Sequence, residues 1–175
     1  MAVKPFLAFG YDEVERAARL WGLNCGPAAL AAAAGVTLEA VRGMIPGFEA
    51  RRYTSPTMMR AGVVAAGLTI VRDDRGRCEE AGRLGAPALI RVQWGGPWTE
   101  RRPDGSMPNP RWAYGATHWI ATAVGAEVPL WIFDVNAGWT TPADWQERVV
   151  PMLTATIRRA SGAWWTTHTW TVRPR

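Results

Sequence analysis

The spacing of apolar residues changes once along the chain, near residue 67, and this change limits the folds that the sequence can adopt. Before it, four segments have helical spacing or helix-forming composition; after it, five segments are rich in strand-favouring residues. We expect helices over residues 11–20, 25–34, 38–44 and 56–66, and strands over residues 68–72, 87–94, 117–124, 128–134 and 164–172. A late helix is expected over 143–154, with Thr141 as its cap and Pro142 at its first position. Helices followed by strands predict an α+β fold with an antiparallel sheet.

The length and composition favour one domain over residues 1–175, with a helical lobe at about 11–67 and a sheet lobe at about 68–175. Hydrophobic residues make up 48% of the chain, which is enough to form a core without disulfides or metal. The chain has two cysteines, Cys25 and Cys78, and two histidines. These numbers indicate neither a disulfide framework nor a zinc site, although a single disulfide between Cys25 and Cys78 remains an alternative. We expect no metal and no cofactor, and we interpret Cys78 as an incidental surface thiol.

The net charge of +5 raises the question of a nucleic-acid partner. The arginines are scattered among acidic residues, which favours an ordinary solvated surface over a nucleic-acid footprint. The first twenty residues lack a signal-peptide core, and the longest apolar stretch, around 28–34, is too short to span a bilayer. We expect no membrane partner and a cytoplasmic protein, in a host cytoplasm or a virion if a phage encodes it.

A cysteine opens the second expected helix. Asn24 precedes Cys25 as a helix cap, and Gly26 and Pro27 suit the first turn. A helix start lowers the pKa of a thiol through unpaired N–H groups and the helix dipole, and the Cys25 N–H could donate to a developing oxyanion. A free cysteine is more often a buried packing residue, so this position alone does not establish a nucleophile.

A base for this thiol can be found among the two histidines. His118 begins a strand directly after a long Pro/Gly-rich segment, whereas His168 alternates with hydroxyl residues and suits an exposed strand position. Asp134 follows sixteen residues after His118, and a hairpin between the two expected strands would bring them together. Asn136 lies on the same strand face as Asp134, so either residue could orient the imidazole.

Three short motifs resemble those of the papain-like clan of cysteine peptidases. They are Cys-Gly-Pro-Ala-Ala-Leu at 25–30, His-Trp-Ile at 118–120, and Asp134 with Gly138 shortly after. The chain is most similar to bacteriocin-leader (double-glycine) peptidase domains and their free-standing bacterial relatives, over roughly residues 11–138. Its segment 138–145 is also similar to small phage-encoded proteins with the same motifs.

The resemblance implies a papain-like fold, with the helix of the cysteine packed on the sheet. It implies that Cys25 is the nucleophile, His118 the general base and acid, and Asp134 the orienting group. The reaction would be attack on an amide or ester carbonyl, formation of an acyl-enzyme and hydrolysis, with a peptide or protein as substrate. The triad does not determine whether water or an amine accepts the acyl group, so an acyl transferase remains an alternative.

The chain departs from the family six residues before the cysteine, where Arg19 replaces a glutamine that donates to the oxyanion. Arg19 could donate instead or point to solvent, and Asn24 is the only nearby carboxamide. Loss of one such donor costs about two to three decades in rate. A catalytically weak or inactive module with a binding or phage-particle role is therefore a further alternative.

Tryptophan is abundant in the second half of the chain, which holds ten of the eleven. Most of these rings are expected to pack in the core and the sheet. Trp94, Trp98 and Trp112 lie beside or within the long segment 95–116 that precedes His118. We expect these three to form a wall of a substrate groove.

Overall fold

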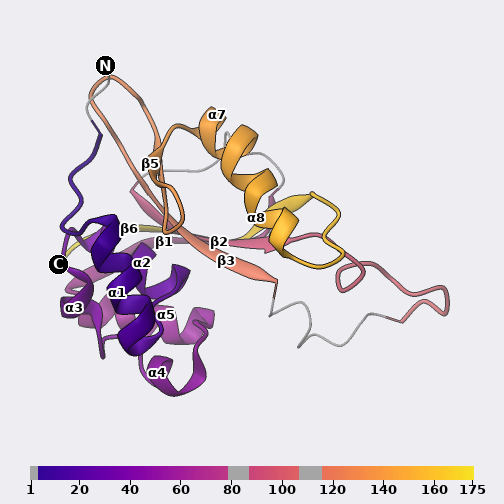
Figure 1. Ribbon diagram of the computed structural model, residues 1–175, viewed down its shortest axis with the longest axis horizontal. Coiled ribbons are helices and arrows are strands. Elements are labelled where there is room, and N and C mark those ends of the chain that lie inside the picture. Colours follow the sequence, from indigo (N-terminus) through magenta and orange to yellow (C-terminus); the bar gives the residue numbers. More distant parts are fainter. Residues whose placement is uncertain (1–3, 79–86, 107–115) are drawn as a thin grey trace.

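The computed structural model describes residues 4–78, 87–106 and 116–175. Helices and a six-stranded antiparallel sheet make up the fold, in agreement with the predicted α+β class (Figure 1). The strands lie in the order β1-β6-β2-β3-β4-β5. Their bounds are β1 Leu68–Cys78, β2 Ala88–Trp94, β3 Thr117–Ala123, β4 Trp131–Asp134, β5 Gly138–Thr140 and β6 Trp164–Pro174.

Five helices precede the sheet and cover one of its faces (Figure 1). They are α1 Tyr11–Trp21, α2 Cys25–Ala34, α3 Leu38–Val41, α4 Phe48–Arg51 and α5 Pro56–Ala65. Helix α2 lies at the centre against β3, and Leu30 in its middle is fully buried. A helix that is apolar on all sides belongs in the interior, which is where the Ala/Leu composition of α2 places it.

Side chains alternate between the two faces of the central strands. Leu89 and Trp119 pack with the helices α1 to α5, whereas Ile90 and Ile120 pack in a second core cluster on the opposite face. A late helical segment covers that face: α7 Pro142–Asp144, the π-helical turn η2 Trp145–Val149 and α8 Val150–Thr156 (Figure 1). The central strand β2 is therefore buried on both sides.

Several boundaries differ from the sequence-based prediction. The third helix ends at Val41 instead of residue 44, before the turn that leads to Pro46. The short elements α4 and β5 were not predicted. Strand β1 extends to Cys78 through an exposed, charged stretch because it pairs with β6 along its length, and this pairing overrides the weak local preference. The described residues include no helix long and apolar enough to cross a membrane.

Gly26, in the first turn of α2, leaves no room for a side chain. A β-carbon added there would lie 2.1 Å from Thr54 Oγ1 and 2.6 Å from Thr54 Cβ. Alanine would favour the helix by about 1 kcal/mol, but overpacking a buried position costs about 1–3 kcal/mol. We expect Gly26→Ala to lower the midpoint of thermal unfolding, followed by circular dichroism. A raised midpoint would contradict the close contact between α2 and Thr54.

Candidate active site

Cys25 is the first residue of α2, and its neighbour fixes this helix start. Asn24 Oδ1 accepts a hydrogen bond from the Gly26 N–H at 3.1 Å, and Asn24 Nδ2 donates to the Arg52 carbonyl at 3.0 Å. Asn24 thus acts as the predicted cap and ties the helix start to the end of α4. No acceptor for the Cys25 backbone N–H is found among the described residues, as is usual for the first residue of a helix.

His118 lies where two neighbouring strands separate. Pairing of β3 with β4 begins at Ala121 opposite Phe133, so the first part of β3 is paired only with β2. Cys25 lies beside this gap, where the neighbouring His118 ring and the Trp119 backbone N–H lower the pKa of its thiol. The second ring nitrogen, His118 Nε2, lies 2.8 Å from Asp134 Oδ2. The structure therefore brings the predicted Cys25, His118 and Asp134 side chains together, with His118 bonded to Asp134 and Cys25 beside the His118 ring.

The carboxylate of Asp134 is completely buried and is bonded on both oxygens. Oδ2 contacts His118 Nε2 and accepts from the Trp145 indole N–H at 3.1 Å. Oδ1 accepts from the backbone and side-chain N–H groups of Asn136 at 3.0 and 2.9 Å. Burial raises the pKa of Asp134, but the charge of His118 and these hydrogen bonds outweigh it and lower that pKa to about 2. Asn136 therefore holds the carboxylate and not the imidazole.

The thiol and the imidazole change each other's proton affinity. Burial raises the pKa of Cys25, but the charge and hydrogen bond of His118 and the Trp119 N–H lower it below its usual value. Burial lowers the pKa of His118, whereas the charges of Cys25 and Asp134 raise it above its usual value. Both shifts favour a thiolate next to an imidazolium, which is the nucleophilic form of cysteine.

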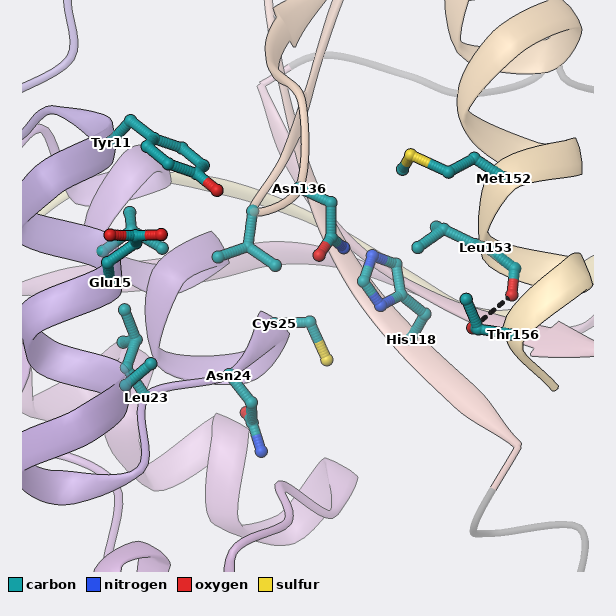
Figure 2. Close-up of a pocket in the computed structure, with 13 residues that line it drawn as sticks. Tyr11, Glu15, Leu23, Asn24, Cys25, His118, Asn136, Met152, Leu153 and Thr156 are labelled. Atoms are coloured by element: carbon teal, nitrogen blue, oxygen red, sulfur yellow. Dashed lines mark hydrogen bonds between the residues drawn. The ribbon is translucent and has the colours of Figure 1, made fainter.

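A cavity of about 650 Å³ opens above the thiol and the imidazole. Figure 2 shows Tyr11 and Glu15 of α1 on one side, Met152 and Leu153 of α8 on the other, and Cys25 with His118 between them. This volume is within the range of small-molecule sites. Cys25 is partly buried and is one of the residues that line this cavity.

Some of the predicted accessory residues lie elsewhere. Of the two alternatives for Arg19, the structure shows the second, in which it points to solvent: its side chain is 72% exposed, pairs with Glu15 one turn earlier at 3.6 Å, and does not line the cavity. The prediction of Trp94 as a groove wall is wrong, because the ring is buried in the second core cluster, 6.0 Å from the His118 ring. Trp98 is partly buried and donates to the Trp94 carbonyl at 2.9 Å. Trp112 and the Cys78 side chain lie outside the described residues.

Sequence reasoning missed Trp145 and the cavity residues of α8. Trp145 is completely buried, and its ring stacks on Trp94 while its N–H bonds Asp134. The only sequence signal was the expected late helix with Thr141 and Pro142 at its start, and this signal gives no direction for the side chains. Within the described ranges, no group of three or more His, Cys, Asp or Glu residues could hold a metal ion.

No protein-family model matches the chain, and no curated protein is detectably similar to it. The chemistry of this site therefore has to be inferred from its geometry.

The reactivity of Cys25 can be measured in a Cys78→Ser background. His118→Ala removes the charge and the hydrogen bond that lower the pKa of Cys25 and leaves burial, which raises it. We expect alkylation of Cys25 by iodoacetamide at pH 7 to slow by about tenfold or more, and its pH midpoint to move upward. Mass spectrometry over time gives both quantities. His168→Ala is the matched control and should alkylate like the parent; equal rates in all three proteins would contradict an activated thiol.

The bond from Trp145 to the carboxylate can be compared with an equivalent bond to a neutral group. Trp145 donates to Asp134, whereas Trp164, packed edge-on against it with ring centroids 4.9 Å apart, donates to the Gln146 side chain at 2.9 Å. We expect Trp145→Phe to lower the free energy of unfolding by about 1.5–3 kcal/mol and Trp164→Phe by about 0.5–1.5 kcal/mol. Urea unfolding at pH 7 measures both. A larger loss for Trp164→Phe would contradict the importance of the charged acceptor.

Proposed function

We propose that the chain is a papain-like cysteine hydrolase that cleaves a peptide or another amide bond. The observation that supports this most is the position of the Cys25 thiol beside the His118 ring, whose Nε2 is bonded to the buried Asp134. A nucleophile, a base and a group that orients the base are the minimum set for covalent acyl chemistry. The position of α2 against an antiparallel sheet, with the cysteine at its first residue, supports the papain-like architecture.

Each residue has one role in the proposed reaction. The Cys25 thiolate attacks the carbonyl carbon, and the His118 imidazolium gives its proton to the departing amine as the C–N bond breaks. This leaves a thioester on Cys25 and a neutral imidazole. His118 then takes a proton from water, whose oxygen attacks the thioester, and release of the acid restores the thiolate and the imidazolium. Asp134 keeps the ring oriented and favours its charged form throughout.

The oxyanion of the first step requires hydrogen-bond donors. The Cys25 backbone N–H at the start of α2 is one such donor. Arg19 lies on the exposed side of α1, so it does not replace the glutamine that the resemblance leads one to expect. This is the observation that favours the second candidate, a weak or inactive module of the same fold with a binding role, because a missing donor costs about two to three decades in rate.

Hydrolysis should depend on pH in a way that the shifted pKa values determine. Activity should rise with pH as Cys25 loses its proton, and this limb should lie at lower pH than for an ordinary thiol because the pKa of Cys25 is lowered. Activity should fall as His118 loses its proton, and this limb should lie at higher pH than for an ordinary imidazole because the pKa of His118 is raised. Asp134→Asn removes a charge that raises the pKa of His118, so the falling limb should move to lower pH. A mixture of internally quenched random peptides can report kcat/KM across pH. An unmoved falling limb would contradict the role of Asp134.

Two further results separate the candidate functions. Cys25→Ala should abolish cleavage of the peptide mixture, since the nucleophile is lost. If the parent protein also cleaves nothing, yet its Cys25 alkylates rapidly, the binding module is favoured. An added primary amine that appears in the product as a new amide would indicate an acyl transferase on the same triad.

A further inference from the structure

Three residues join α4 to the cap of α5, and this 52–54 connector contacts the chain on both sides of the reactive cysteine. On one side, the Arg52 carbonyl accepts the hydrogen bond from Asn24 Nδ2 at 3.0 Å. On the other side, the Thr54 side chain lies against Gly26, where an added β-carbon would be 2.1 Å from Thr54 Oγ1. The residues directly before and after the cysteine are therefore held by one short segment.

The connector also reaches the strand that carries the imidazole. The Thr54 carbonyl accepts a buried hydrogen bond from the Trp119 indole N–H at 2.9 Å. Trp119 follows His118 on β3, and its backbone N–H is one of the groups that lower the pKa of Cys25. Thr54 thus links the first turn of α2, through its side chain, to the residue beside the imidazole, through its carbonyl.

The backbone of the connector adopts a conformation that is uncommon for an arginine. Arg52 has φ 60° and ψ 23°, in the left-handed region, and Arg159 is the only other non-glycine residue with positive φ in the described part of the chain. The Arg52 N–H donates to the Phe48 carbonyl at 2.7 Å, and its carbonyl meets the Asn24 amide. Strained backbone of this kind persists only where the surrounding contacts determine it, and it is concentrated at functional sites.

The side chain of Arg52 extends the connector to the end of α1. Gly22 is the left-handed C-cap of α1, and a β-carbon on it would lie 1.6 Å from Arg52 Nη1. The connector therefore contacts α1, α2 and β3, yet none of its three residues lines the cavity above the thiol.

We infer that the 52–54 connector is a positioning element that holds the start of α2 against β3, so that Cys25 lies beside His118 and the Trp119 backbone N–H. It acts through the neighbours of the reactive residues. If it is released, the start of α2 can move away from β3. The groups that lower the pKa of Cys25 then lose part of their effect, whereas burial, which raises this pKa, remains.

The test cuts one link at a time and measures the pH midpoint of Cys25 alkylation by iodoacetamide in the full-length Cys78→Ser protein. Trp119→Phe removes the bond to the Thr54 carbonyl. Trp139→Phe is the matched control: both rings are buried in the same core cluster and pack on another aromatic ring, but the Trp139 N–H has no partner among the described residues. We expect the alkylation midpoint to rise by about half a pH unit or more in Trp119→Phe and to stay in place in Trp139→Phe.

The second link is cut from the side of the helix. Asn24→Ser keeps an oxygen that can cap α2 but is too short to donate to the Arg52 carbonyl, so it should also raise the alkylation midpoint. Thr37→Ala is its control, because it removes the side-chain cap of the neighbouring helix α3. This control should lower the temperature of unfolding and leave the alkylation midpoint unchanged.

Both links hold the same segment, so the double variant Asn24→Ser/Trp119→Phe should shift the alkylation midpoint by less than the sum of the single shifts. His118 and Asp134, the charged groups that act on the thiol, are intact in all these variants. Additive shifts, or an unmoved midpoint in single variants that circular dichroism shows to be folded, would overturn the connector. So would equal shifts in the two controls. If Trp119→Phe does not fold, the result for Asn24→Ser stands as the test.

The outcomes also separate this inference from the proposed function, since alkylation of Cys25 does not require turnover. An unmoved midpoint in a protein that cleaves peptides would overturn the connector and leave the hydrolase. A midpoint that responds to both links in a protein that cleaves no peptide would support the connector and overturn the hydrolase.

Discussion

A buried carboxylate is costly unless its oxygens are bonded and its charge is balanced, and the site around Asp134 is arranged to meet both conditions. Two donors come from Asn136 in the β4–β5 turn, one from Trp145 in the late helical segment, and the contact with His118 comes from β3. Three separate parts of the chain must therefore be in place before this charge can be buried. The imidazole cannot rotate without breaking its bond to the carboxylate, so the fold fixes the ring that faces Cys25.

The late helical segment supports the site because its register determines which of its side chains face the core and which face the cavity. Trp145 begins the π-helical turn, and π turns are rare and often found at functional sites. The wider turn lets the segment place Trp145 and Val149 into the second core cluster while Met152 and Leu153, further on, line the cavity. One short segment thus bonds Asp134 and forms a wall of the cavity beside Cys25. A change in the register of this segment would therefore affect both the orientation of the imidazole and the shape of the cavity.

Sequence reasoning predicted the parts of the site that depend on local structure. Asn24 and Pro27 mark a helix start, and the spacing of His118 and Asp134 matches a hairpin, so each could be placed from its neighbours. The direction of Arg19 stayed open and Trp94 was misplaced, because the direction of a side chain depends on how its helix or strand packs. Arg19 faces solvent since Glu15 and Ala18 occupy the cavity side of α1, and Trp94 faces inward since Trp145 covers it. Only the packed structure contains this information.

The end of the β3–β4 pairing at Ala121 determines which part of β3 lies open beside Cys25. The two strands pair only over Ala121–Ala123, and β4 ends at Asp134. The first part of β3, which holds His118 and Trp119, is therefore paired with β2 alone, and the His118 ring and the Trp119 backbone N–H both lower the pKa of Cys25. In the proposed reaction, the charge of His118, this N–H group and the start of α2 would stabilise the thiolate. The short β4 keeps His118 and Trp119 beside Cys25 and outside a β3–β4 ladder, which supports the proposed chemistry.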